Sequence, residues 1–101
     1  LLKKLDQSTA IVCYNDQIAM KLMQLLSNSE LSVPEDLSLV SFDNSSLSQI
    51  GTISLTSVTH PGKELGRLAA ESILMMIENP DYEIKYVYEP ELIVRQSVKK
   101  L

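Results

Sequence analysis

Two apolar runs in this sequence end in polar side chains that are suited to binding a small polar molecule. Asn15 comes directly after the run Ala10–Tyr14, and Asp43 closes the run Leu37–Phe42. If both runs are strands of one parallel sheet, their carboxyl ends meet at the edge where open α/β sheets bind ligands. A carboxylate accepts hydrogen bonds from vicinal hydroxyls, and an amide both donates and accepts. We therefore treat Asn15 and Asp43 as candidate ligand contacts, with Phe42 beside them.

The same polar residues also have a purely structural interpretation. Asn44 and Ser45 follow Asp43, so this carboxylate is also suited to an Asx-turn. Asn15 or Asp16 can cap the helix that follows, because a short side-chain oxygen accepts from the free N–H groups of a first helical turn. The convergence of both polar strand ends on one edge is more specific for a ligand site than either end alone.

Composition and charge limit what the chain can be. Of its 101 residues, 45% are hydrophobic and 22% are charged, which is ordinary for one soluble globular domain or part of one. The formal net charge of −4 argues against direct contact with the phosphate backbone of nucleic acid. No apolar run is long enough to span a bilayer, and no signal-peptide pattern is present. We therefore expect a cytoplasmic protein with no membrane partner.

The chain holds one cysteine and one histidine, which is too few for a recognisable metal site. Cys13 lies inside an apolar run without a disulfide partner, so we expect a buried thiol in a reducing compartment. The sequence contains no metal-ligand spacing, no phosphate-binding loop and no nucleophile motif. We therefore expect no metal and no other cofactor.

The apolar pattern predicts an α/β domain around a parallel-sheet βαβ core. Residues 10–14 and 37–43 are expected strands, and a helix to about residue 27 lies between them. The dense apolar residues of 37–43 are typical of a strand buried on both faces. Residues 1–5 are expected to end an earlier helix. The predicted core stripe of the helix is Ile18, Leu22, Leu25 and Leu26.

The second half of the chain is predicted to add three short strands and one long helix. Pro61 suits the first position of that helix, since proline has no N–H to leave unpaired there. The expected elements are a loop over 45–51, a strand over 53–58, a helix over 61–78, an edge strand over 82–88 and a short buried strand over 92–94.

A series of short motifs extends from about Ala10 to Ser97, and the series is more specific than any of its members. The motifs are Asn15-Asp16, Val33-Pro34-Glu35-Asp36-Leu37, Ser41-Phe42-Asp43, Leu55-Thr56-Ser57-Val58, Leu65-Gly66, Ala69-Ala70 and Leu92-Ile93-Val94-Arg95-Gln96-Ser97. In this order and spacing they resemble the C-terminal part of the effector-binding domain of the lactose/galactose-repressor (LacI/GalR) family. The ending from Glu89 to Ser97 is most similar to the branch of that family that regulates L-arabinose utilisation.

The resemblance implies the C-terminal portion of a periplasmic-binding-protein-like (type I) fold, in which two α/β lobes close on a sugar in the interlobe cleft. It places residues 1 to about 55 and about 90–101 in the C-terminal lobe, and the helix over about 61–78 in the N-terminal lobe. The chain of residues 1–101 is then a partial sugar-sensing effector domain. The resemblance also implies a cytoplasmic homodimer that binds operator DNA. The DNA is bound by an N-terminal domain that is absent from this chain, and binding of the ligand alters the binding of DNA.

The resemblance also assigns roles to individual residues. Asn15 matches a family residue that hydrogen-bonds sugar hydroxyls, and Asp43 matches the ligand-contacting acid. His60 falls where relatives carry Gln or His near the cleft, and Phe42 is expected to support the site from beside Asp43. The surface that the family uses for dimerisation corresponds to Met20, Met23, Gln24, Gln49 and Ile50. Methionine on a half-exposed helix side suits a subunit contact, although it is more often partly buried core.

Three functions are compatible with these features. The first is a transcriptional repressor that senses a small-molecule sugar and has no enzymatic activity. The second is an extracytoplasmic sugar-binding protein of a transporter. The third is an α/β enzyme in which Asp43 acts as general base with His60 as its partner, but the sequence holds no further catalytic motif to support it.

Overall fold

The computed structural model describes residue 5 and residues 7–100, and these form two compact units. The first unit extends to His60 and resumes at Glu91, and the second runs from Pro61 to Pro90. The helix end expected at residues 1–5 lies mostly outside the described residues, but Leu5 is described and its side chain is buried.

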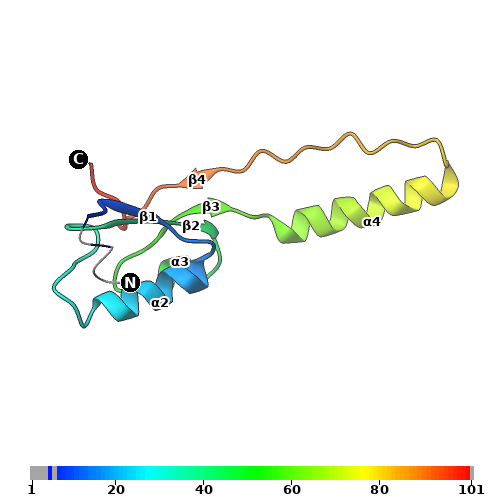
Figure 1. The fold of residues 1–101 in the computed structure, drawn as a ribbon. Coiled ribbons are helices and arrows are strands. Elements are labelled where there is room, and N and C mark those ends of the chain that lie inside the picture. The colour runs from blue at the N-terminus through cyan, green and yellow to red at the C-terminus, as the bar shows by residue number, and fades with distance from the viewer. Residues whose placement is uncertain (1–4, 6, 101) are drawn as a thin grey trace. The chain divides into compact units, whose positions relative to one another are not determined.

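Four strands of the first unit form one sheet in the order β1-β2-β3-β4 (Figure 1). They are β1 (Ala10–Val12), β2 (Ser38–Asp43), β3 (Thr56–Thr59) and β4 (Leu92–Ile93). The first three are parallel, and β4 is antiparallel to β3. In register, Asp43 pairs with Thr59, so β2 and β3 end at the same edge. The expected α/β architecture with a parallel βαβ core is confirmed.

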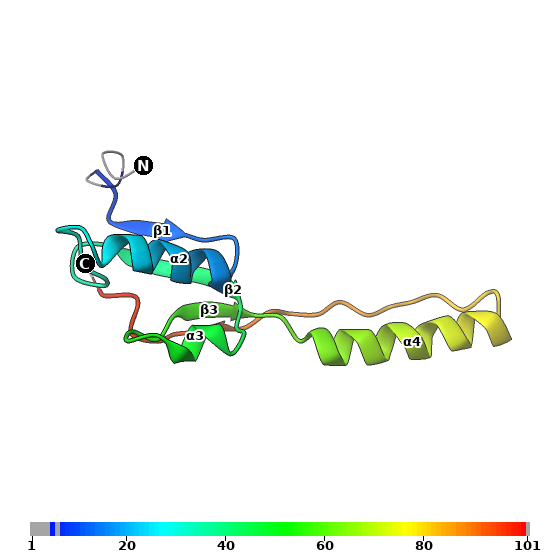
Figure 2. The same cartoon turned by 90° about the horizontal axis from the view of Figure 1, so that it is seen from below.

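Two helices of this unit, α2 (Asp16–Leu26) and α3 (Leu47–Ile50), cover one face of the sheet (Figure 2). Asn15 starts α2, because its Oδ1 accepts the N–H of Ile18 at 2.9 Å. The core between α2 and the sheet is apolar and includes Ala19, Leu22, Leu26, Leu37, Leu39 and Leu55. Burying each of the larger side chains contributes about 1.5–3 kcal/mol, so this face carries most of the stability of the unit.

The opposite face of the sheet is not covered by a helix of this unit, within the part of the chain that the structure describes. In β2, Leu39 and Ser41 are fully buried on the helix side, whereas Phe42 is 43% exposed. The prediction of a strand buried on both faces is therefore wrong for its last two residues. The predicted helix stripe also needs correction, because Ile18 and Leu25 are exposed and Ala19 takes part in the core instead.

The boundaries of the later elements differ from the sequence prediction. The expected loop over 45–51 contains α3, and β3 begins only at Thr56. The segment 82–88 is extended but pairs with no described strand, because alternation along a chain does not by itself provide a neighbour for hydrogen bonding. The last strand is short, and Leu92 at its start is 51% exposed rather than buried.

The helix of the second unit, α4 (Gly62–Glu78), has no fully buried residue. Pro61 caps it rather than occupying its first turn, since the carbonyl of Pro61 accepts the N–H of Leu65 at 3.0 Å. Near its end the helix exposes five consecutive apolar residues, Ile73, Leu74, Met75, Met76 and Ile77, which at about 3.6 residues per turn extend around the whole helix. Its only described ion pair joins Arg67 and Glu71 one turn apart at 2.7 Å, on the surface.

Candidate functional site

The predicted ligand contacts all lie at the carboxyl-end edge of β1, β2 and β3. The N–H of Cys13 donates to the carbonyl of Val40 at 2.8 Å, so the pairing of β1 with β2 continues almost to Asn15. Asp43 is the last residue of β2, and its register partner Thr59 directly precedes His60. The sheet topology therefore brings together residues that are far apart in the sequence.

Asn15 combines the two roles that the sequence left open. Its Oδ1 is used by the helix cap, and the residue is half-buried. The amide NH2 group has no hydrogen-bond partner among the described residues. Asn15 is therefore available to a ligand as a donor, while the position of its side chain is fixed by α2.

Asp43 is exposed and has a strained backbone. Its φ is 96°, and that of Asn44 is 45°, so both residues occupy the left-handed region that non-glycine residues rarely adopt. Such a conformation costs about 1–3 kcal/mol per residue and is concentrated at functional sites. The N–H of Asn44 donates to Ser57 and that of Ser45 donates to Asp16. The Asx-turn interpretation of Asp43 is therefore wrong, and its carboxylate has no described partner.

Asp16 is the buried centre of the polar edge, with 1% of its surface exposed. Its Oδ1 accepts the hydroxyls of Ser41 at 2.5 Å and Ser57 at 2.7 Å. Its Oδ2 accepts the N–H and hydroxyl of Ser45 at 2.6 and 2.8 Å. Burial by itself would raise the pKa of the Asp16 carboxyl, but these hydrogen bonds outweigh it and the pKa is lowered. Asp16 therefore joins α2 to the strand ends and is not exposed to a ligand.

Arg95 is a second anchor of the same edge, which sequence reasoning missed. Its Nη2 donates to Oδ1 of Asn44 at 2.6 Å, and its Nη1 donates to the carbonyl of Leu55 at 2.7 Å. Nη1 also lies 3.1 Å from the hydroxyl of Ser48. All of these partners are neutral. The only signal in the sequence was the position of Arg95 within the last motif, which gives no indication that its side chain reaches Asn44.

Phe42 and His60 lie at the edge without a described polar contact. Phe42 is partly exposed, and because side chains alternate along a strand it points to the sheet face opposite Ser41. His60 is exposed at the end of the first unit. Neither residue is placed against Asp43 by a hydrogen bond, so the arrangement provides no acid–base pair.

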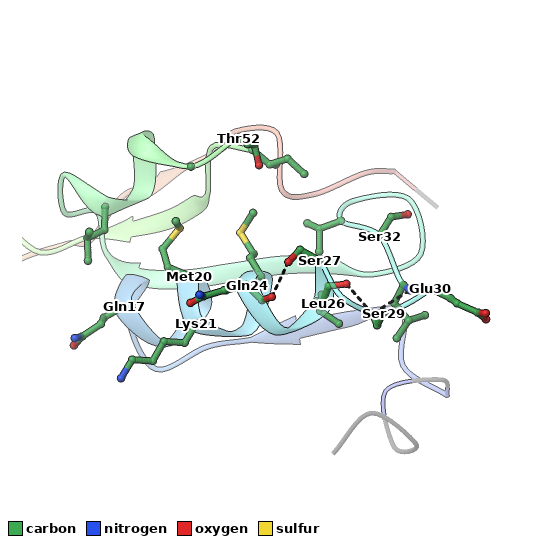
Figure 3. Close-up of a pocket in the computed structure, with 16 residues that line it drawn as sticks. Gln17, Met20, Lys21, Gln24, Leu26, Ser27, Ser29, Glu30, Ser32 and Thr52 are labelled. Atoms are coloured by element: carbon green, nitrogen blue, oxygen red, sulfur yellow. Dashed lines mark hydrogen bonds between the residues drawn. The ribbon is translucent and has the colours of Figure 1, made fainter.

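A separate groove lies between α2 and the segment that follows α3, with a cavity volume of about 780 Å³. Met20 extends from α2 toward the segment that carries Thr52 (Figure 3). Met20, Met23 and Gln24 of the predicted dimer surface line this groove, and their role in dimerisation stays a prediction. Gln49 and Ile50 lie nearby on α3 and are exposed, but they are not part of the lining.

The structure also bears on metals and membranes. Residues 5 and 7–100 contain no group of three or more His, Cys, Asp or Glu side chains that could hold a metal ion. Over the same residues, no helix is both long and apolar enough to cross a membrane. Burial raises the pKa of the Cys13 thiol, which keeps it in the unreactive protonated form.

Comparison with known proteins gives matches over almost the whole chain. Residues 1–98 match the model of the periplasmic binding protein-like domain. The arabinose metabolism transcriptional repressor of Geobacillus stearothermophilus is 40% identical over 100 residues, which cover 97% of this chain and 28% of that protein. The HTH-type transcriptional repressor PurR of Vibrio vulnificus is 38% identical over 98 residues, which cover 95% of this chain and 29% of that protein.

A solved structure is similar in both sequence and fold. It is a LacI family transcriptional regulator from Enterococcus faecalis with bound ribose, which superposes with a TM-score of 0.86 and is 30% identical in sequence. The match covers 94% of this chain and 36% of that one. The chain therefore spans about a third of the length of the proteins it resembles.

Proposed function

The chain belongs to the family of periplasmic binding protein-like domains, and from this premise we propose that it is the C-terminal part of the sugar-sensing domain of a bacterial transcriptional repressor. The expected fold class and the resemblance to the LacI/GalR repressors are confirmed. The ligand, the assembly and the DNA binding of the whole protein are parts of this proposal.

The observation that carries the proposal is the pair of unengaged polar groups at the strand ends. The amide NH2 of Asn15 and the carboxylate of Asp43 have no described hydrogen-bond partner, although both residues are held in place by the backbone around them. A donor and a doubly accepting carboxylate at one edge suit the vicinal hydroxyls of a sugar. L-arabinose is the first sugar to test, given the relative that is a repressor of arabinose metabolism.

In the repressor that we propose, the sugar shifts a conformational equilibrium and is not chemically converted. The two units correspond to parts of two lobes, with residues up to about 55 and from about 90 in the C-terminal lobe and the helix over 61–78 in the N-terminal lobe. Closure of the lobes on the sugar changes the geometry of a cytoplasmic homodimer, and operator DNA is read by a segment outside these 101 residues. The dimer forms through the methionine side of α2, with Gln49 and Ile50 at its border.

Calorimetric titration of the intact repressor with L-arabinose, D-ribose and cellobiose tests the proposal. We expect one of the pentoses to bind, and Asp43→Ala to weaken it roughly ten- to a hundredfold, which corresponds to the loss of a charge-assisted hydrogen bond. Asp81→Ala, at an exposed site in the second unit, is the matched control and should leave the affinity unchanged. Equal affinities of parent and Asp43→Ala would contradict the assignment of Asp43, and the absence of binding by every sugar would overturn the proposed function.

A further inference from the structure

The strained residues Asp43 and Asn44 need external contacts to keep their conformation. Both have positive φ values, and neither is glycine. The carboxylate of Asp43 itself has no described partner, so it does not stabilise its own backbone. The backbone of Asp43 is paired with Thr59 in the sheet, and the further contacts at this strand end act on Asn44, the residue that follows.

Two contacts hold Asn44, one through its backbone and one through its side chain. Its backbone N–H donates to the hydroxyl of Ser57 at 3.0 Å, and that hydroxyl donates in turn to buried Asp16 at 2.7 Å. Its side-chain Oδ1 accepts from Arg95 at 2.6 Å. The backbone and the side chain of Asn44 are thus bonded to groups that belong to other elements of the sheet.

Arg95 is itself held in one position. Its Nη1 donates to the carbonyl of Leu55 and to the hydroxyl of Ser48, and its Nη2 donates to Oδ1 of Asn44. The planar fork of a guanidinium can satisfy such separate acceptors at once, which the ammonium group of lysine cannot do in the same geometry. The guanidinium of Arg95 is half-buried, and all of its described partners are neutral. Taking a charge out of water without an opposite charge beside it costs free energy, so charge pairing does not account for the position of Arg95.

We propose that Arg95 and Asn44 are positioning residues of the ligand site, which hold the end of β2 so that the Asp43 carboxylate is presented to the sugar in a fixed orientation. This inference rests on the proposed function, because it takes Asp43 to be a ligand contact. The bond from Arg95 to Asn44 keeps Asn44 in the left-handed conformation, and Asn44 keeps Asp43 in place. Arg95 acts on affinity through the backbone and does not touch the ligand.

A double-mutant cycle in the intact repressor tests the proposal with L-arabinose, or D-ribose if that is the pentose bound by the parent. Arg95→Met should weaken binding by roughly fivefold or more, because the strand end loses its anchor. Glycine adopts positive φ without strain, so Asn44→Gly removes the need for the anchor. Arg95→Met should consequently have little further effect in the Asn44→Gly background. Arg67→Met, which removes an exposed guanidinium from α4, is the control and should not change affinity.

Two further variants separate positioning from general stability. Asn44→Asp keeps an acceptor for Arg95 and tolerates positive φ, so it should bind sugar nearly as well as the parent, whereas Asn44→Ala should not. Thermal melting of every variant accompanies the titrations, and if Arg95→Met does not fold, the comparison of Asn44→Asp with Asn44→Ala decides the proposal. Additive effects of Arg95→Met and Asn44→Gly, or unchanged affinity in Asn44→Ala, would overturn the positioning role while leaving the proposed function intact. A parent protein that binds no sugar would instead refute the proposed function.

Discussion

Ser57 donates its hydroxyl hydrogen to Oδ1 of Asp16 at 2.7 Å, and thereby joins β3 to the first residue of α2. The same hydroxyl oxygen accepts the N–H of Asn44 from the end of β2. One small side chain thus connects three elements at the carboxyl-end edge of the sheet. The candidate ligand contacts lie around this connection, so changes to the buried polar groups should affect both stability and binding.

Replacing the buried carboxylate should be strongly destabilising. Asp16→Asn keeps the shape but leaves only one acceptor oxygen for the donors from Ser41, Ser57 and Ser45. We expect the free energy of unfolding to fall by about 2–4 kcal/mol, because hydrogen bonds to a buried charge are lost and an NH2 group now faces hydroxyl donors. Urea denaturation measures this change. Asp81→Asn at an exposed position is the control, and a loss of equal size there would contradict the special role of Asp16.

The carboxyl of Asp16 should make the free energy of unfolding depend on pH. The pKa of Asp16 is lower in the folded protein than its unfolded value of about 3.9. Its contribution is therefore complete above the unfolded pKa and is lost as the pH falls through the folded pKa. We expect the stability difference between parent and Asp16→Asn to be constant at neutral pH and to narrow below about pH 4. Asp36, whose pKa is lowered by hydrogen bonds from Ser32, titrates in both proteins and cancels in the difference.

Relieving the backbone strain at Asp43 should increase stability at the expense of binding. Asp43→Gly places at φ 96° the one residue that adopts this value freely. We expect a gain of about 1 kcal/mol in the free energy of unfolding, together with a roughly ten- to hundredfold weaker affinity for the sugar, as for Asp43→Ala. Thermal unfolding and calorimetric titration are the two measurements. If Asp43→Gly is destabilised, the positive φ is not a source of strain.

The methionine side of α2 should control the oligomeric state. Met20→Glu with Met23→Glu introduces two charges into the groove that Met20, Met23 and Gln24 line. We expect the intact repressor to become monomeric while its far-ultraviolet circular dichroism is retained, because buried like charges oppose a subunit contact. Sedimentation velocity reports the result. Met75→Glu with Met76→Glu changes the two methionines of α4 and should leave the dimer unaffected; an intact dimer in the α2 variant would place the interface elsewhere.

The 101-residue chain by itself should self-associate. The apolar surface that residues 73–77 form around α4 is exposed, and each such side chain left in water forfeits about 1.5–3 kcal/mol of burial. We expect oligomers whose mass rises with protein concentration, as measured by multi-angle light scattering. Leu74→Lys with Ile77→Lys should disperse them. A monodisperse monomer at high concentration would show that this face needs no partner.

Elements that depend on local pattern could be predicted from the order of the residues alone. Apolar periodicity predicted β1, α2, β2 and α4 to within a few residues, because the period of a strand or a helix is written in consecutive side chains. The polar strand ends at Asn15 and Asp43 were predicted to share an edge, since parallel strands separated by a helix must end on the same side. These inferences needed no knowledge of distant contacts.

Which polar residues are buried and which remain available to a ligand depends on contacts between distant parts of the chain. Asp16 and Asn15 are adjacent in sequence, yet one is enclosed by serines from β2, β3 and the following loop while the other keeps a free amide. Arg95 reaches Asn44 across 51 positions of sequence, and the positive φ of Asp43 is held by that contact network. The segment 82–88 alternates like a strand but belongs to none of the strands that the structure describes. In each case the burial or pairing of a residue depends on which distant part of the chain packs beside it. The local sequence pattern does not specify that neighbour.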